Sequence, residues 1–164
     1  MLILRFIRNF IILQLSMILG KLDVYSQDYS FIRYDTRDGL AGSVVYDAIQ
    51  DKEGFIWFAS ENGLSRFDGK NFKPFTTQDG LPDNEILKLF LDSKDRLWIM
   101  PFKPSICYYY KGKIYTKTDD TLISKVKLSA NAVNMAEDKS GNLFIAEMRA
   151  WHKISNNGFI KNRT

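Results

Sequence analysis

From residue 44 onward, the chain alternates between short apolar runs and short polar turns. The segment VVYDAIQDKEGFIWFASENGLSRFDGKNF, residues 44–72, is rich in β-branched and aromatic residues, which favour strands. Its runs end at turn signals: Asp51-Lys52-Glu53-Gly54 has Asp first and Gly fourth, and Asn62-Gly63 is a strong hairpin signal. This pattern predicts four strands, at 44–51, 55–60, 64–68 and 71–75, paired in one antiparallel sheet.

The same pattern returns twice further along the chain. An offset of 41 residues places Asp79-Gly80-Leu81 on Asp38-Gly39-Leu40 and Trp98 on Trp57, and a further offset of 46 places Phe144 on Trp98. Four strands in each period of about 40 to 50 residues are typical of β-propeller blades. The expected fold class is therefore all-β, a partial β-propeller of about three four-stranded antiparallel blades plus one N-terminal closing strand.

The repeated residues resemble a known family. The pattern D-G-L, then D-x-x-G-x-(I/L)-W-(F/I), then N-G-L-x-R-(F/Y)-D-G is similar to the two-component regulator propeller repeat of Bacteroidetes-type hybrid two-component systems. The resemblance covers nearly all of residues 29–164 and is closest in the first blade. It implies a sensor propeller outside the inner membrane, which detects oligosaccharides from complex glycans and signals through a transmembrane helix to a histidine kinase. The kinase domain itself is not expected in this sequence.

The chain divides into five expected parts. Residues 1–26 read as a signal peptide, because Arg5 and Arg8 precede an apolar core and Val24-Tyr25-Ser26 suits cleavage before Gln27. An uncleaved anchor is the alternative, although the apolar core is shorter than the roughly 20 residues that a span needs. We therefore expect export to the periplasm or cell envelope. The other parts are the outermost strand of a closing blade, at 27–37, and blades at 38–77, 78–117 and 118–164.

The N-terminal strand indicates that the propeller is incomplete. At the 41-residue offset, Phe31 falls on Phe72 and Tyr34 on Phe75, so this strand corresponds to the outermost strand of a blade whose other strands are missing. Such a strand closes the ring by completing the last blade, and propellers close with about four to eight blades. We expect an N-terminal fragment of a larger sensor, whose remaining blades and membrane-bound histidine kinase are its partners. Assembly of three-blade chains into a ring is the alternative.

Composition excludes several classes of function. Outside the first 26 residues, 20 basic and 18 acidic residues leave a net charge of +2, so nucleic-acid binding is not expected. The single histidine, His152, is expected at an ordinary strand position, and the single cysteine, Cys107, in a core. We expect no metal site, no cofactor and no catalytic residue. The recurring Asp51, Asp92 and Asp138 predict turn caps, and the recurring Trp57, Trp98 and Phe144 predict core packing.

Candidate binding residues follow from propeller topology. The ligand face is built from loops between the second and third strands of each blade and from connections between blades, here at 37–43, 60–62, 78–85, 100–105 and 147–150. Two of these loops, 100–105 and 147–150, depart from the repeat. Their Phe102, Lys103 and Arg149 suit stacking on, or hydrogen bonding to, a sugar and are the predicted ligand-binding residues; loop drift without function is the alternative. Trp151 aligns with Leu64 and is expected in a core.

Three classes of function stay open. The first is a ligand-sensing propeller fragment that recognises an oligosaccharide and is not catalytic by itself. The second is an exported protein-interaction scaffold. The third is a propeller glycan lyase or hydrolase, which would need paired carboxylates or a Tyr/His/Arg set on the channel face. The sequence offers no such set, so it favours the first class.

Overall fold

The computed structural model describes residues 2–19, 30–158 and 160–163. These fall into two units, residues 1–33 and residues 34–164. The first contains helix α1 (Leu2–Leu19), and no helix in the described part of the chain is both long enough and apolar enough to span a bilayer. The expected cleavage site at residues 24–27 lies outside the described residues, so the signal peptide stays a prediction.

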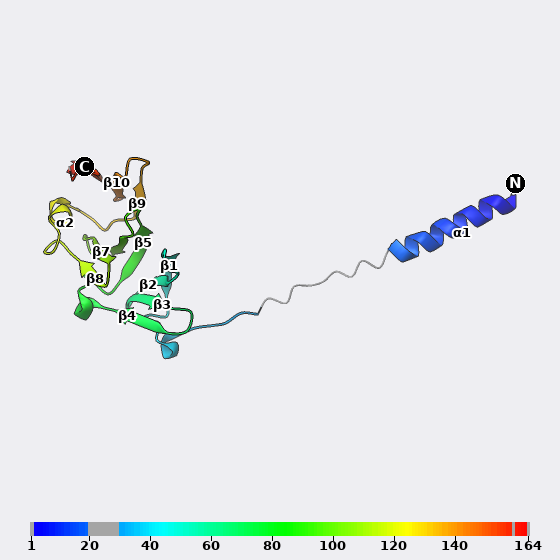
Figure 1. Ribbon diagram of the computed structural model, residues 1–164, viewed down its shortest axis with the longest axis horizontal. Helices are drawn as coiled ribbons and strands as arrows, with labels where there is room; N and C mark the ends of the chain where they lie inside the picture. The colour runs from blue at the N-terminus through cyan, green and yellow to red at the C-terminus, as the bar shows by residue number, and fades with distance from the viewer. Residues whose placement is uncertain (1, 20–29, 159, 164) are drawn as a thin grey trace. The chain divides into compact units, whose positions relative to one another are not determined.

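The second unit consists of three four-stranded antiparallel sheets (Figure 1), so the predicted fold class is confirmed. We call them blade one (β1–β4), blade two (β5–β8) and blade three (β9–β12), and in each sheet the strands follow chain order. The strands are β1 (Val45–Gln50), β2 (Ile56–Ser60), β3 (Gly63–Phe67), β4 (Phe72–Phe75), β5 (Ile86–Leu91), β6 (Leu97–Pro101), β7 (Cys107–Tyr110), β8 (Lys113–Tyr115), β9 (Asn134–Glu137), β10 (Leu143–Ala146), β11 (Trp151–Ile154) and β12 (Ile160–Arg163). Short helices η1 (Thr36–Asp38), η2 (Thr77–Asp79) and α2 (Thr121–Lys125) lie in the connections.

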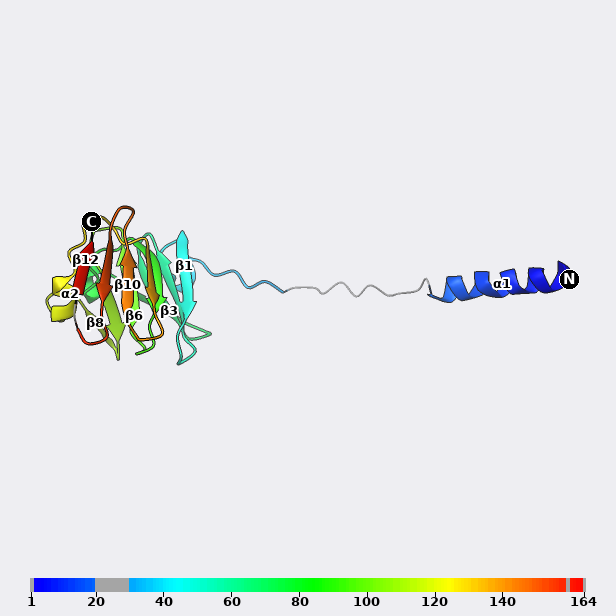
Figure 2. The same ribbon diagram turned by 90° about the horizontal axis from the view of Figure 1, so that it is seen from above.

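The blades stack face to face around their first strands. Strand β5 contacts both β1 and β9, and these strands lie close together (Figure 1), while Figure 2 shows the strands of the three sheets with their axes roughly aligned. One hydrophobic core lies between blades one and two and another between blades two and three. Because side chains alternate along a strand, β6 sends Leu97 and Ile99 into the first core and Trp98 and Met100 into the second.

The aspartate repeated at the first turn of each blade joins that turn to the core. In blade two, Asp92 Oδ1 accepts hydrogen bonds from the turn amides of Lys94 and Arg96, both at 2.9 Å, and Oδ2 accepts one from Trp98 Nε1 at 2.8 Å. Blade one repeats this arrangement with Asp51 and Trp57, at 2.7 Å. Both indoles are 1% exposed, which confirms the predicted turn caps and tryptophan packing.

Blade three keeps the turn and changes the core partner. Phe144 replaces the tryptophan and has no N–H group, so Asp138 Oδ2 accepts a hydrogen bond from Asn142 Nδ2 instead, at 2.7 Å. This bond, with the amides of Asn142 and Ser140, outweighs burial and lowers the pKa of Asp138. Phe144 is half-buried on the face of blade three turned away from blade two.

The hairpin between β2 and β3 differs from the predicted one by one residue. Ser60 pairs with Gly63, so the two-residue turn is Glu61-Asn62 and not Asn62-Gly63. Gly63 lies in β3 with φ at +143°, and a Cβ there would lie 2.5 Å from the carbonyl oxygen of Phe75. The glycine is therefore needed for close approach to β4 rather than for the turn.

The expected closing strand has no ladder partner within the described residues. Residues 30–35 hold no regular secondary structure, and the ring of Tyr34 packs on blade one, 5.0 Å from Phe67 and 5.4 Å from Phe72. A ladder requires neighbouring strands from another part of the ring, so the closing role of residues 27–37 stays a prediction.

The expectation for Trp151 is wrong. Its side chain is 38% exposed and lies with Phe144, at a ring distance of 6.2 Å, on the face of blade three turned away from blade two. Trp151 holds the strand position of Leu64, but blade two covers that face in blade one, whereas no described blade covers it in blade three.

Candidate functional site

A pocket of about 840 Å³ opens at the loop end of blade two. Successive strands run in opposite directions, so the loop between β6 and β7 and the connections between blades come to the same end of the sheet. Three segments line the pocket: residues 80–82 before β5, residues 103–106 between β6 and β7, and part of the connection at 116–128 between β8 and β9. The pocket therefore lies on the predicted ligand face.

Core residues form the apolar part of the pocket wall. Leu81, Ile106 and Ile123 are each 3–4% exposed and also belong to the cores beside blade two. Since these side chains are close-packed on their other sides, the blade cores hold the shape of the wall.

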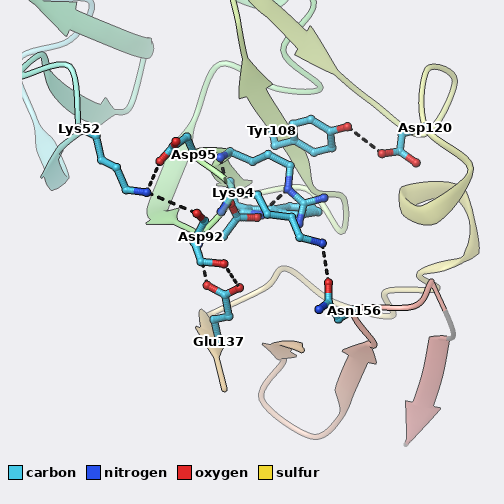
Figure 3. Close-up of polar contacts among 11 residues, drawn as sticks. Lys52, Asp92, Lys94, Asp95, Tyr108, Asp120, Glu137 and Asn156 are labelled. Carbon is cyan, nitrogen blue, oxygen red and sulfur yellow. Dashed lines mark hydrogen bonds and ion pairs between the residues drawn. The ribbon is translucent and has the colours of Figure 1, made fainter. Parts of the chain in front are cut away.

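A buried hydrogen bond fastens the connection at 116–128 to blade two. Tyr108 on β7 donates its hydroxyl to Asp120 Oδ2 at 2.7 Å (Figure 3), and Asp120 Oδ1 caps α2 by accepting the amide of Leu122 at 2.8 Å. Burial, followed by the hydrogen bond to Asp120, raises the pKa of Tyr108 well above its usual range, so the phenol stays a donor at neutral pH. This contact positions the helix that carries Ile123 and Ser124 into the pocket wall.

The polar part of the wall is cationic and rich in hydroxyl groups. Lys103, Lys117 and Lys127 line the pocket, and no carboxylate is among its lining residues. The nearest recorded acidic partner, Asp83, lies 3.7 Å from Lys103 Nζ, and the lysine side chain is 63% exposed, so this pair is weak. Ser105 Oγ is buried without a hydrogen-bond partner in the described structure.

The structure places one of the three predicted ligand residues in this pocket. Lys103 lines it, whereas Phe102, 58% exposed, and Arg149, exposed on the β10–β11 loop, do not. The role of all three in binding stays a prediction. Lys117 and Lys127 were missed because they lie on the connection between blades two and three. Its length and its lysines were the available signal.

The other repeat departure, at 147–150, builds a buried pair. Glu147 Oε1 lies 2.6 Å from His152 Nε2, with both side chains 1% exposed. Glu147 also accepts hydrogen bonds from Ser129 Oγ at 2.6 Å and from the amide of Ala130 at 2.8 Å. Burial alone would raise the pKa of Glu147, but the hydrogen bonds from Ser129, His152 and Ala130 outweigh it, so the pKa is lowered. His152 does lie in a strand, as predicted, and the pair fastens the entry of blade three to β11.

Polar contacts at the opposite end join the blades through their turns (Figure 3). Lys52 of blade one pairs with Asp95 of blade two at 2.5 Å. Ser93 of blade two donates its amide and hydroxyl to Glu137 of blade three at 2.7 and 2.6 Å. Lys94 Nζ donates to Asn156 Oδ1 at 2.7 Å. Each contact bridges neighbouring blades, so together they orient the sheets that carry the pocket wall.

Sequence comparison agrees with this architecture. The family model described as two component regulator propeller matches residues 39–62, which run from the end of η1 to the β2–β3 turn. Residues 39–62 thus match one two-component regulator propeller repeat. This propeller is also 34% identical over 64 residues to Histidine kinase P4 of Formosa agariphila, a match that covers 39% of this chain and 5% of the kinase.

Solved structures share the fold of this propeller. The extracellular domain of BT3049 from B. thetaiotaomicron, described as a hybrid two component system, superposes with a TM-score of 0.68 at 15% identity, covering 86% of this chain and 19% of that one. The extracellular domain of BT4673 from the same organism, described as a one component system, gives 0.62 at 20% identity, covering 79% and 18%. The chain thus spans about a fifth of these domains and 5% of the kinase. Among the described residues, no three His, Cys, Asp or Glu side chains gather as a metal site would require.

Proposed function

We propose that this chain is part of a periplasmic sensor propeller of a hybrid two-component system, and that it binds glycan-derived oligosaccharides without converting them. The observation that carries the proposal is the 840 Å³ pocket at the loop end, with core residues in its wall and lysine and hydroxyl groups around it. A preformed cleft with an apolar wall and a few convergent polar groups is the usual form of a small-ligand site.

The relatives support the location and the partners in this proposal. Two share the fold and are described as extracellular domains of two-component or one-component systems, and a third is described as a histidine kinase. A basic and apolar N-terminal segment fits export. The partners we propose are the remaining blades and a membrane-bound histidine kinase.

The non-catalytic part of the proposal rests on the roles of the buried ionisable groups. Glu147 and His152 bind each other and residues 129–130, so this pair acts as a clamp in the fold. Lys103, Lys117 and Lys127 are suited to holding a ligand, and no lining carboxylate stands beside them as a general acid or base.

A binding screen tests the proposal. The 164-residue chain is titrated with a panel of glycan oligosaccharides by calorimetry, and each mixture is chromatographed for product. We expect saturable binding to at least one member without product, with a gain in unfolding free energy of about 2.7 kcal/mol at a hundredfold excess over Kd. Absence of binding across the panel, or turnover of a bound sugar, contradicts the proposal.

Two variants on α2 place the site. Ser124→Trp puts a large ring into the pocket wall, whereas Thr121→Trp adds the same ring to the same helix at an exposed position that does not line the pocket. We expect the first to abolish binding and the second to preserve it. Equal effects of the two variants would place the ligand elsewhere.

A further inference from the structure

We infer that the pocket at the loop end of blade two selects anionic ligands, and that oligosaccharides bearing carboxylate or sulfate groups are the class it takes. The sugar part of this inference rests on the proposed function. The anionic part rests on the charges that line the pocket.

Three separate segments each contribute one lysine to the lining. Lys103 follows β6, Lys117 follows β8 and Lys127 follows α2, and all three line the same space. A sphere of 840 Å³ is about 12 Å across, so a group at its centre lies about 6 Å from the wall, which is within the Debye length of about 8–10 Å. A ligand anion would be attracted by all three at once.

Two other pockets in the described part of the propeller carry both signs of charge. One of about 570 Å³ has Asp79 and Asp119 beside its lysines, and Asp119 is already paired with Lys113 at 2.7 Å. Another, of about 320 Å³, includes Asp51, Glu53 and Asp95 with Lys52 and Lys111. The absence of carboxylates among its lining residues distinguishes the 840 Å³ pocket from these two, although the 570 Å³ pocket shares Gly80, Thr116 and Thr118 with it.

The uncharged lining suits the remainder of a sugar. Ser105 offers a hydroxyl with no partner in the described structure. The hydroxyls of Thr116 and Ser124 also line the pocket but already donate within the protein, to Asp119 Oδ2 at 2.9 Å and to the carbonyl oxygen of Thr121 at 2.8 Å. A buried hydroxyl without a partner is costly, and rotation about one χ1 angle can offer it to a ligand oxygen. Pro82 and other aliphatic side chains in the wall fit the C–H faces of a pyranose ring.

The test compares sugars that differ only in charge. The full 164-residue chain is titrated by calorimetry with oligogalacturonides and with their methyl esters, which are neutral, and with a sulfated galactan oligosaccharide and its desulfated form. We expect at least one anionic member to bind at least tenfold more tightly than its neutral counterpart, and to weaken as salt is raised. The first pair reports carboxylate recognition and the second reports sulfate recognition.

Lysine variants locate the effect. Each of K103Q, K117Q and K127Q is expected to weaken anion binding about threefold, and the triple variant about thirtyfold, because exposed charge pairs are individually weak. The matched control is the triple variant K70Q/K139Q/K161Q, which removes three exposed lysines that do not line the pocket. Urea unfolding of each variant confirms that it is folded.

The outcomes separate this inference from the proposed function. Equal affinity for charged and neutral sugars, or anion binding that survives the pocket triple variant, overturns the inference and leaves oligosaccharide sensing intact. Failure of every sugar to bind overturns both. Anion-selective binding that is lost in the pocket triple variant and kept in the control supports the inference.

Discussion

Asp92 is the residue whose replacement should destabilise blade two most. Its carboxylate is 2% exposed and accepts four hydrogen bonds: from the amides of Lys94 and Arg96 at 2.9 Å, from Arg96 Nε at 2.6 Å and from Trp98 Nε1 at 2.8 Å. Asp92→Ala leaves the turn amides, a guanidinium and an indole without their acceptor. Figure 3 shows that the adjoining turn also carries the contacts to blades one and three.

The magnitude follows from burial. Removing one partner of a buried ion pair costs about 3–5 kcal/mol, since the other charge is left uncompensated. The side chain of Arg96 is 15% exposed and can recover part of its hydration, so we expect the lower end, about 3 kcal/mol. With a urea m-value of about 2 kcal/mol/M, the unfolding midpoint falls by about 1.5 M.

Two further variants isolate the buried contact from the turn. Asp138→Ala removes the same turn cap in blade three, where the carboxylate is exposed and no indole binds it, so its destabilisation should be clearly smaller. In the double variant Asp92→Ala/Trp98→Phe, the indole donor is absent. Its loss of unfolding free energy should be smaller than the sum of the losses in the two single variants by about 1–2 kcal/mol. Equal destabilisation by the two alanine variants, or strict additivity in the double variant, would refute the reasoning.

Three other predictions test the packing around the pocket and the blades. Tyr108→Phe removes the hydroxyl that binds Asp120, so the free energy of unfolding should fall by about 1–2 kcal/mol. The backbone amides of residues 121–125 should also exchange faster with deuterium. Unchanged exchange would show that this hydrogen bond does not hold α2. Glu147 has a pKa below its usual value of 4.5, so its ionised form stabilises the fold above pH 4.5, and this stabilisation is lost as the pH falls through the lowered pKa of the folded state. The difference in unfolding free energy between wild type and Glu147→Gln should therefore narrow in acid. A difference that does not change with pH would contradict this. Cys107 is 0% exposed, and burial raises the pKa of its thiol. Iodoacetamide should therefore label Cys107 only as urea unfolds the chain. Rapid labelling of the native protein would contradict this.

The blades could be predicted from the sequence because their determinants are local and repeated. Strand alternation, a turn aspartate and an aromatic six residues later occur in each unit, and Asp51 with Trp57 shows the same bonds as Asp92 with Trp98. Whether a face is covered depends on a neighbouring blade, however. This is why Leu64 is buried and Trp151, at the same strand position, is 38% exposed.

The pocket could not be predicted because no local pattern describes it. Its wall brings together Leu81, Lys103 and Lys127, which belong to three different connections. The connection that carries Lys127 is held by the contact of Tyr108 with Asp120, between residues twelve positions apart that share no repeat position. Of these three residues, Lys103 alone lies in a loop that departs from the repeat.

Departures from a repeat therefore need a structural comparison before they are assigned a function. In blade one, Glu61 accepts the amides of Ser43 and Val44 at 2.8 and 2.7 Å and so holds the entry to β1. In blade three, Glu147 does the same for the entry to β9, with His152 beside it, so the change at 147–150 is a second solution to one packing problem. The loop at 100–105 is different, because Lys103 lies in the wall of a pocket that has no lining carboxylate, unlike the two smaller pockets described above. Of the two irregular loops, this one carries the stronger case for ligand binding.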